Sequence, residues 1–152
     1  MKPNLQQFKA IASGTEMIVP VNLISDIIHV ATYDSHINPE SFVINSLLAF
    51  SIYKFDRYRD AQEANTENIT EFYDAILKNK NSIEFLLFSS SVCTITLLIH
   101  YQMYIILPVY LSSFLYKNIK TLNFPVKPFY VSSLWTISTC IIPEYTNTDI
   151  LA

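Results

Sequence analysis

Apolar and polar positions alternate in long blocks along this chain, and the apolar blocks occur in pairs. The longest block, residues 85–116, contains no Asp, Glu, Lys or Arg. As a single α-helix it would reach about 48 Å, well beyond the roughly 30 Å hydrocarbon core of a bilayer. The block therefore predicts a helical hairpin that turns near His100, Tyr101 and Gln102, because two short helices fit that thickness.

The remaining apolar blocks extend this prediction to an all-α, multi-pass transmembrane bundle of about five helices. Most blocks are at or below the usual length of a spanning helix, roughly 17–25 residues, so length alone leaves them ambiguous. A polar turn at residues 34–40 joins the first two helices, and a polar loop at residues 56–82 follows the second. The predicted helices are residues 17–33, 41–55, 83–99, 101–116 and 129–143.

The distribution of basic residues removes much of this ambiguity. The Lys and Arg residues form three clusters, which are Lys2 and Lys9; Lys54, Arg57, Arg59, Lys78 and Lys80; and Lys117, Lys120 and Lys127. Lys and Arg near helix ends resist translocation, so all three clusters belong on the cytoplasmic side. They share a side only if the chain crosses an even number of times between them. We therefore expect five crossings, with the N-terminus and the basic loops in the cytoplasm.

Composition agrees with a protein in contact with the lipid bilayer. Hydrophobic residues make up 51% of the 152 residues and charged residues only 15%, against about 25% in soluble domains. The length suits one domain, residues 1–152. A net charge of -3 without a strongly basic surface argues against a nucleic-acid partner. Cys93 and Cys140 lack the spacing of a metal site and are expected to be buried free thiols.

Asp26 is a polar residue inside the first predicted helix. A charge at the bilayer centre costs about 2.5–3.5 kcal/mol on insertion scales, so such a residue is a functional candidate by default. Four interpretations stay open: a neutralised carboxyl, a pair with His29 three residues on, a position facing a wet cavity, or a position near the interface. His36 and His100 are interpreted as interfacial polar residues.

A short amphipathic helix is expected inside the polar loop at residues 56–82. Phe72, Tyr73, Ile76 and Leu77 recur at a spacing that places them on one helix face. Such a helix either rests on the membrane surface, caps the bundle, or forms a lid over a site on the basic side.

The densest chemistry lies where the second predicted helix ends. Asp56 and Asp60 are four residues apart, so their carboxylates share one face if the helix continues. Two carboxylates at a membrane boundary suit Mg²⁺, which binds one or two carboxylates together with phosphate oxygens. Arg57 and Arg59 beside them would bind phosphate directly. The alternative is a solvated helix end, with the arginines as cytoplasmic anchors and the aspartates as their surface partners.

The segment from Asp56 to Asp60 resembles the first aspartate motif of the UbiA superfamily of intramembrane prenyltransferases, Asn-Asp-x-x-Asp-x-x-x-Asp. It matches the latter half of that motif, including an Arg after the second Asp position. Tyr116 and Lys120 resemble the Tyr-x-x-x-Lys turn after the fourth helix of the family. Lys127, Trp135 and Pro143 resemble its fifth helix, so the resemblance covers roughly residues 20–145.

The resemblance implies a function and a site. Members of this family transfer a prenyl group from an isoprenoid diphosphate that Mg²⁺ holds between two aspartate motifs. By this resemblance Asp56 and Asp60 would bind Mg²⁺, and Arg57 and Lys120 would bind the substrate diphosphate. The chain would then correspond to the N-terminal half of the nine-helix bundle of the family.

Two departures from the family pattern open an alternative. Ile52 and Tyr53 occupy the Asn-Asp positions, and Glu144 and Asp149 do not form a second aspartate motif. Prenyl transfer would therefore require a second polypeptide that completes the bundle. The alternative is a catalytically inactive, degenerate small multi-pass membrane protein that retains only the helical scaffold.

Overall fold

A computed structural model describes residues 5–64, 70–115 and 132–146, and the regular elements in these ranges are all helical. This confirms the all-α prediction for the described part of the chain. The elements are α1 (Leu5–Ala12), η1 (Thr15–Met17), α2 (Ile18–Tyr33), α3 (Pro39–Glu63), α4 (Glu71–Lys78), α5 (Lys80–His100), α6 (Ile106–Phe114), η2 (Ile137–Ile141) and α9 (Ile142–Thr146).

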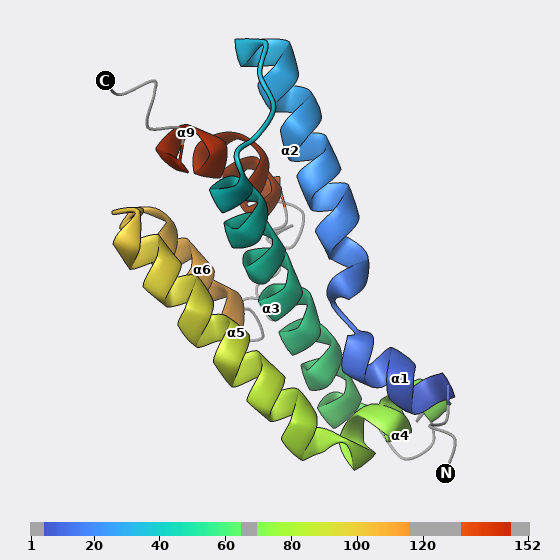
Figure 1. The fold of residues 1–152 in the computed structure, drawn as a ribbon. Helices are drawn as coiled ribbons and strands as arrows, with labels where there is room; N and C mark the ends of the chain where they lie inside the picture. The colour runs from blue at the N-terminus through green and yellow to red at the C-terminus, as the bar shows by residue number, and fades with distance from the viewer. Residues whose placement is uncertain (1–4, 65–69, 116–131, 147–152) are drawn as a thin grey trace, which may run out of the picture.

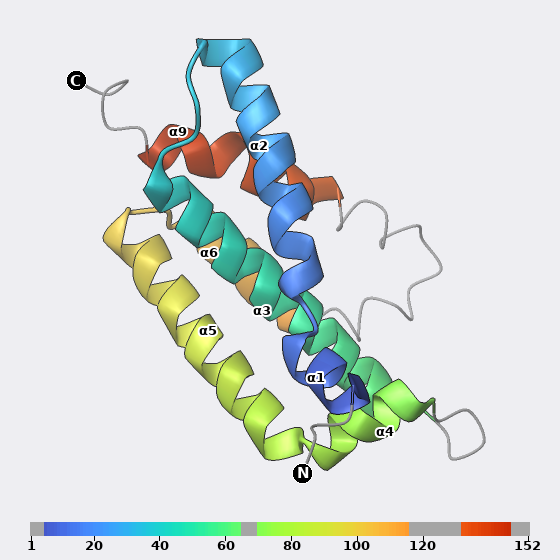
Figure 2. The same ribbon diagram turned by 45° about the vertical axis from the view of Figure 1, so that its right-hand side comes forward.

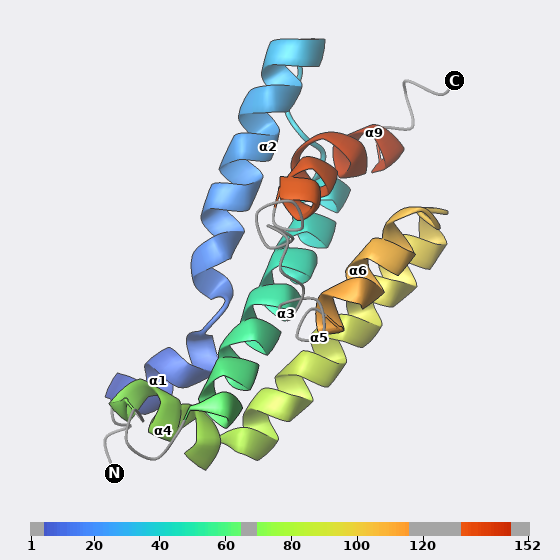
Figure 3. The same cartoon turned by 180° about the vertical axis from the view of Figure 1, so that it is seen from behind.

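Helix α3 lies at the centre of the bundle. Figure 1 shows α2 along one side of α3 and the antiparallel pair α5 and α6 along the other, and Figure 3 shows the same order from behind. Helices α1 and α4 lie together at one end, and α9 lies near the opposite end, beside the start of α3 (Figure 2). We call these the α1/α4 end and the α9 end.

Helix α3 is longer than the predicted segment 41–55 and continues to Glu63. It begins at a strong N-terminal signal, since the Asn38 side chain accepts a hydrogen bond from the backbone N–H of Ser41 at 2.8 Å and Pro39 occupies the first turn. At its other end Arg59 forms ion pairs with Asp56 and Glu63, at three and four residues' spacing. Residues 56–63, predicted as loop, are therefore helical.

The predicted hairpin within residues 85–116 is present as two helices joined by a turn. Helix α5 ends at His100, and Gln102 adopts a left-handed conformation with φ 56° while Met103 N–H bonds back to the Leu98 carbonyl at 2.8 Å. Helix α6 begins only at Ile106, later than the predicted start at residue 101. Pro108 explains the delay, because its ring would clash with the carbonyl of Tyr104 if the helix extended further back.

Two groups of buried apolar residues form the core, one toward each end. The group toward the α9 end joins α3, α5, α6, η2 and α9 through Ile44, Leu48, Leu98, Met103, Ile106, Tyr110, Ile137 and Ile142. The group toward the α1/α4 end joins α1, α3, α4 and α5 through Ala10, Tyr58, Ala61, Ala75, Ile76, Ile83 and Leu87. The short helix predicted in the polar loop is α4, and its apolar face caps the bundle through the second group.

Gly14 bends the N-terminal helices. Its φ is 98°, a region that residues with a Cβ atom rarely adopt, and a Cβ atom there would lie 2.9 Å from the carbonyl oxygen of Phe50. The bend between α1 and residues 15–33 is 57°. Glycine is thus required both for the turn and for the close approach of α3.

Helix α5 is the one helix of the described ranges that is long and apolar enough by itself to cross a membrane. Helix α1 and residues 15–33 meet the same criterion only when they are taken together as one bent span. The predicted helix at residues 129–143 is described from residue 132, and its helical structure continues through η2 and α9 to Thr146.

Candidate functional site

Every Lys and Arg of the described residues lies toward the α1/α4 end of the bundle, on α1, the second half of α3, α4 or the first residue of α5. These residues are Lys9, Lys54, Arg57, Arg59, Lys78 and Lys80. The ion pair Lys78–Asp74 lies at this end as well. The basic cluster that the sequence predicts around residues 54–80 is thus one region in space.

Within this region Asp56 and Asp60 lie one turn apart on α3, and both are half-buried. Asp56 accepts a hydrogen bond from Arg59 Nη2 at 3.0 Å. Arg59 itself is buried, with 6% of its surface exposed, and lies over the Phe55 ring with Glu63 3.7 Å from its Nε atom. Arg59 therefore holds Asp56 against the helix surface. This ion pair fits the alternative interpretation of the segment, in which the aspartates are partners of the arginines and not metal ligands.

Arg57, predicted to bind diphosphate, is exposed on α3. The structure thus pairs the carboxylate of Asp56 with Arg59 rather than with Arg57. Lys120, the other predicted diphosphate ligand, lies outside the described residues. Among the described residues no three His, Cys, Asp or Glu side chains gather closely enough to hold a metal ion. Mg²⁺ that is bound mainly through substrate phosphate needs only one or two protein carboxylates, and Asp56 and Asp60 supply that number.

Tyr58 occupies the opposite, buried side of the same helix turn. Its hydroxyl donates to Glu84 Oε1 on α5 at 2.5 Å, and Lys80 lies 3.7 Å from the same oxygen. Burial, together with the hydrogen bond to Glu84, raises the pKa of Tyr58 to about 12. The tyrosine is therefore a neutral hydrogen-bond donor that fastens α3 to the start of α5.

Lys54 has a role that the sequence did not reveal. Its ammonium is fully buried and donates to the carbonyl oxygens of Ile11 at 2.6 Å and Ser13 at 3.0 Å, while it lies 4.9 Å from the centre of the Phe50 ring. These carbonyls belong to the C-terminal end of α1, where a cation is favourable. One signal was available, because Lys54 is the one charged residue inside the apolar block 41–55.

Asp26 pairs with His36, and this excludes one of its four open interpretations, a pair with His29. Its carboxylate lies 2.9 Å from His36 Nδ1 and accepts the backbone N–H of Ile37 at 3.0 Å. The chain after α2 reverses at Asp34, which has φ 54°, and this reversal brings residues 36 and 37 back beside Asp26. His29 instead contacts the Ser35 carbonyl through Nδ1 at 2.8 Å. Asp26 therefore lies in the C-terminal half of α2, where the loop that joins α2 to α3 folds back over it.

A second set of polar groups, also missed by the sequence, lies between α2, α3 and η2. Ser25 contacts the carbonyls of Ser138 and Thr139 at 3.4 Å each, and Asn45 donates to Ser25 at 3.3 Å. Asn22 donates to Ser46 at 3.0 Å. The signal was present as small polar residues at helical spacing, but their partners lie on other helices, from 20 to 114 positions away, and no local pattern identifies them.

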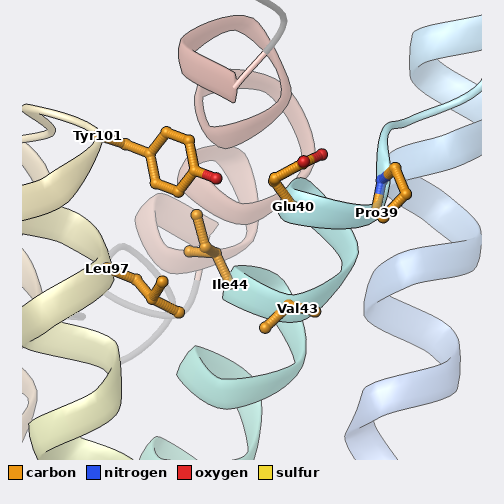
Figure 4. A pocket seen from close by; sticks show the side chains of 6 residues that line it. All are labelled: Pro39, Glu40, Val43, Ile44, Leu97 and Tyr101. Carbon is orange, nitrogen blue, oxygen red and sulfur yellow. The ribbon is translucent and has the colours of Figure 1, made fainter.

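A shallow hollow of about 260 Å³ lies between the start of α3 and the end of α5. Its lining is mainly apolar and is shown in Figure 4, which labels Pro39, Glu40, Val43, Ile44, Leu97 and Tyr101. Glu40 supplies the one carboxylate and Tyr101 the one hydroxyl of the lining. This hollow is at the α9 end, away from Asp56 and Asp60, so it does not join them in a common site.

Cys93 and Cys140 are free thiols as expected, but the prediction that both are buried is wrong, because Cys93 is exposed on the outer surface of α5 and Cys140 is only half-buried. Comparisons of the chain with protein-family models, with curated proteins and with solved structures give no match.

Proposed function

We propose that this chain is a multi-pass helical membrane protein whose α1/α4 end lies on the cytoplasmic side. The observation that carries this proposal is the outer surface of the bundle, where large apolar side chains are exposed along two helices. They are Val19, Leu23, Ile24, Ile27 and Val30 on α2, and Phe85, Phe88, Val92 and Ile99 on α5. In water such contiguous apolar faces are unfavourable, whereas lipid acyl chains cover them.

The two ends of the bundle differ in charge in a way that supports this orientation. The α9 end carries acidic residues such as Asp34, Glu40 and Glu144, and among its described residues there is no Lys or Arg. All described Lys and Arg residues lie toward the other end. Basic residues mark the cytoplasmic side, while Asp and Glu contribute little to topology.

Helix lengths fit crossings by some helices better than by others. At 1.5 Å per residue, the 21 residues of α5 reach about 32 Å and the 25 residues of α3 about 38 Å. The 16 residues of α2 reach about 24 Å, which suits a thin bilayer or local thinning. The 9 residues of α6 reach about 14 Å, so its crossing requires further residues after Phe114.

Reporter fusions test this topology. A reporter fused after Asp60 or Lys120 should be cytoplasmic, and one fused after Gln102 or Ala152 should lie on the opposite side. A cytoplasmic reporter at Ala152 would rule out five crossings. A cytoplasmic reporter after both Asp60 and Gln102, in protein that fractionates with the soluble phase, would rule out the membrane proposal itself.

A second candidate function, prenyl transfer of the UbiA type, is favoured by one specific observation. Asp56 and Asp60 share a half-exposed face of α3 at the basic end, next to the exposed Arg57. In this proposal the two carboxylates would hold Mg²⁺, and the ion would supply positive charge to stabilise a diphosphate leaving group. Arg57 and Lys120 contact the diphosphate oxygens, and a second polypeptide completes the bundle. Without that partner the chain is an inactive scaffold.

Binding of an isoprenoid diphosphate in the presence and absence of Mg²⁺ separates these two alternatives. The double substitution Asp56→Asn and Asp60→Asn should abolish Mg²⁺-dependent binding if the carboxylates hold the ion. Asp74→Asn is the matched control, because Asp74 is a carboxylate at the same end that forms an exposed ion pair with Lys78 on α4. Equal binding by wild type and the double variant would exclude the metal role and leave the scaffold.

A further inference from the structure

Helix α1 presents a narrow apolar stripe away from the bundle. Leu5, Phe8 and Ile11 recur every third residue and are exposed by 64%, 65% and 39%. Ala10 lies on the opposite side of the helix, is fully buried, and packs in the same apolar group as Ala75 and Ile76 of α4. The stripe is therefore not an incompletely packed core face, because the face of α1 that meets the bundle is a different one.

Two hydrogen bonds from α3 hold the end of α1 in this orientation. Lys54 binds the carbonyl oxygens of Ile11 and Ser13 at the end of the helix. Ser13 also donates to the Ala10 carbonyl at 2.8 Å, and Gly14 allows the chain to approach α3 closely. A short helix that was free to rotate would turn Leu5, Phe8 and Ile11 inward. The fixed orientation indicates that their outward position is part of the structure.

We propose that α1 is an interfacial anchor, which lies along the cytoplasmic surface of the bilayer with Leu5, Phe8 and Ile11 inserted among the lipid chains just below the headgroups. This inference rests on the proposed membrane function and names the partner of the N-terminal segment. Amphipathic helices with Phe and Leu on one face and polar residues on the other occupy this boundary. Lys9 flanks the stripe at one residue from Phe8, where its ammonium reaches the headgroups.

Lipid is the occupant because the stripe is continuous with the surface assigned to the membrane. Helix α2 follows α1 through Gly14 and the single turn η1, and it exposes Val19 and Leu23 within its first two turns. The 57° bend turns α1 away from the axis of α2. If α2 crosses the membrane, this bend brings α1 closer to the plane of the membrane surface. Helix α1 also lies beside α4 at the charged end of the bundle, and not among the apolar helices (Figure 2).

The depth of single tryptophans in vesicles of phosphatidylcholine tests the anchor. The full chain carrying Trp135→Phe supplies a background without tryptophan. Phe8→Trp reports on the stripe, Gln7→Trp on the flank of the same helix, and Phe88→Trp on the exposed face of α5. Each variant is reconstituted with lipids brominated either near the headgroup or near the chain terminus, and fluorescence quenching is compared.

The anchor predicts that Phe8→Trp is quenched about twofold more by shallow than by deep bromines, as expected for a helix about 5–10 Å into the boundary. Gln7→Trp should be quenched less than Phe8→Trp by both lipids, and Phe88→Trp should be quenched most by deep bromines. Deep quenching of Phe8→Trp would overturn the anchor in favour of one bent span. Unquenched, blue-shifted emission would overturn it in favour of a protein partner such as a second copy.

Failure of the anchor and failure of the membrane proposal give different results. If Phe88→Trp is quenched and Phe8→Trp is not, the bundle is in the membrane and only the anchor is wrong. If Phe88→Trp is unquenched, the membrane proposal is wrong and the anchor falls with it.

Discussion

The ammonium of Lys54 donates a hydrogen bond to the backbone carbonyl of Ser13, so that a residue in the middle of α3 holds the end of α1. The same ammonium also bonds to the Ile11 carbonyl. A buried charge requires such partners, because an unpaired one would be strongly unfavourable. The orientation of α1 and the ionisation of Lys54 therefore depend on each other.

Lys54→Met removes this link and should lower the free energy of unfolding by about 2 kcal/mol, the scale of a hydrogen bond to a charged group. Equilibrium unfolding in mixed detergent micelles measures the change, and proteolysis near residue 14 should become faster. Lys78→Met is the control, since Lys78 is in an exposed pair and should change stability by less than about 1 kcal/mol. Equal stability of the two variants would contradict the role of Lys54.

Gly14→Ala should destabilise the protein by about 1–3 kcal/mol, because a left-handed residue with a Cβ atom is strained and this Cβ atom meets Phe50 O at 2.9 Å. Asp34→Gly is the matched control at another positive φ, 54°. It removes a Cβ atom from a left-handed position and should leave stability equal or slightly higher. Thermal unfolding of both variants in the same detergent decides the matter, and a neutral Gly14→Ala would show that the bend is not constrained.

Arg59 and Arg57 are separated by one residue, and they should respond oppositely in two assays. Arg59→Met leaves Asp56 without its ion pair and should cost about 2 kcal/mol of stability. Arg57→Met alters an exposed side chain and should change stability by less than about 0.5 kcal/mol. Binding of an isoprenoid diphosphate should instead weaken in Arg57→Met if the prenyltransferase proposal holds. Loss of stability in Arg57→Met would invert this assignment.

The hydrogen bond from Tyr58 to Glu84 predicts a pH dependence in the alkaline range. The pKa of Tyr58 is raised to about 12 in the folded protein, so the unfolded chain, with an ordinary tyrosine pKa near 10, loses this proton first. The contribution is therefore fully present below about pH 10 and is lost as the pH rises through 12. Unfolding measured from pH 8 to 12 should show a steeper loss for wild type than for Tyr58→Phe. Parallel curves would contradict the shift.

The helical class and the hairpin could be predicted from the sequence because both depend on local patterns. The block without charges at residues 85–116 is too long for one crossing, and the polar residues His100 and Gln102 mark the turn within it. Helix ends were less predictable, since α3 continues past its apolar part through the ion pairs of Arg59 with Asp56 and Glu63. Those pairs depend on helix geometry that hydrophobicity does not encode.

Contacts in the candidate site were predicted less well, because the partners come from separate segments of the chain and their meeting depends on the fold. Two histidines are close to Asp26 in the sequence, and helical spacing favours a pair with His29. The chain reversal at Asp34 instead brings His36 against the Asp26 carboxylate. Lys54 was counted with the cytoplasmic cluster because its partners in α1 lie 41 and 43 positions away. The metal role of Asp56 and Asp60 stays a prediction, as does the resemblance that suggested it.

The contact of Ser25 with the carbonyls of Ser138 and Thr139 has a consequence for the order of assembly. These partners are separated by 113 and 114 positions, so a ribosome must synthesise residues 138 and 139 before they can meet Ser25. The contact between α2 and η2 therefore cannot form before residues 138 and 139 have been added to the chain.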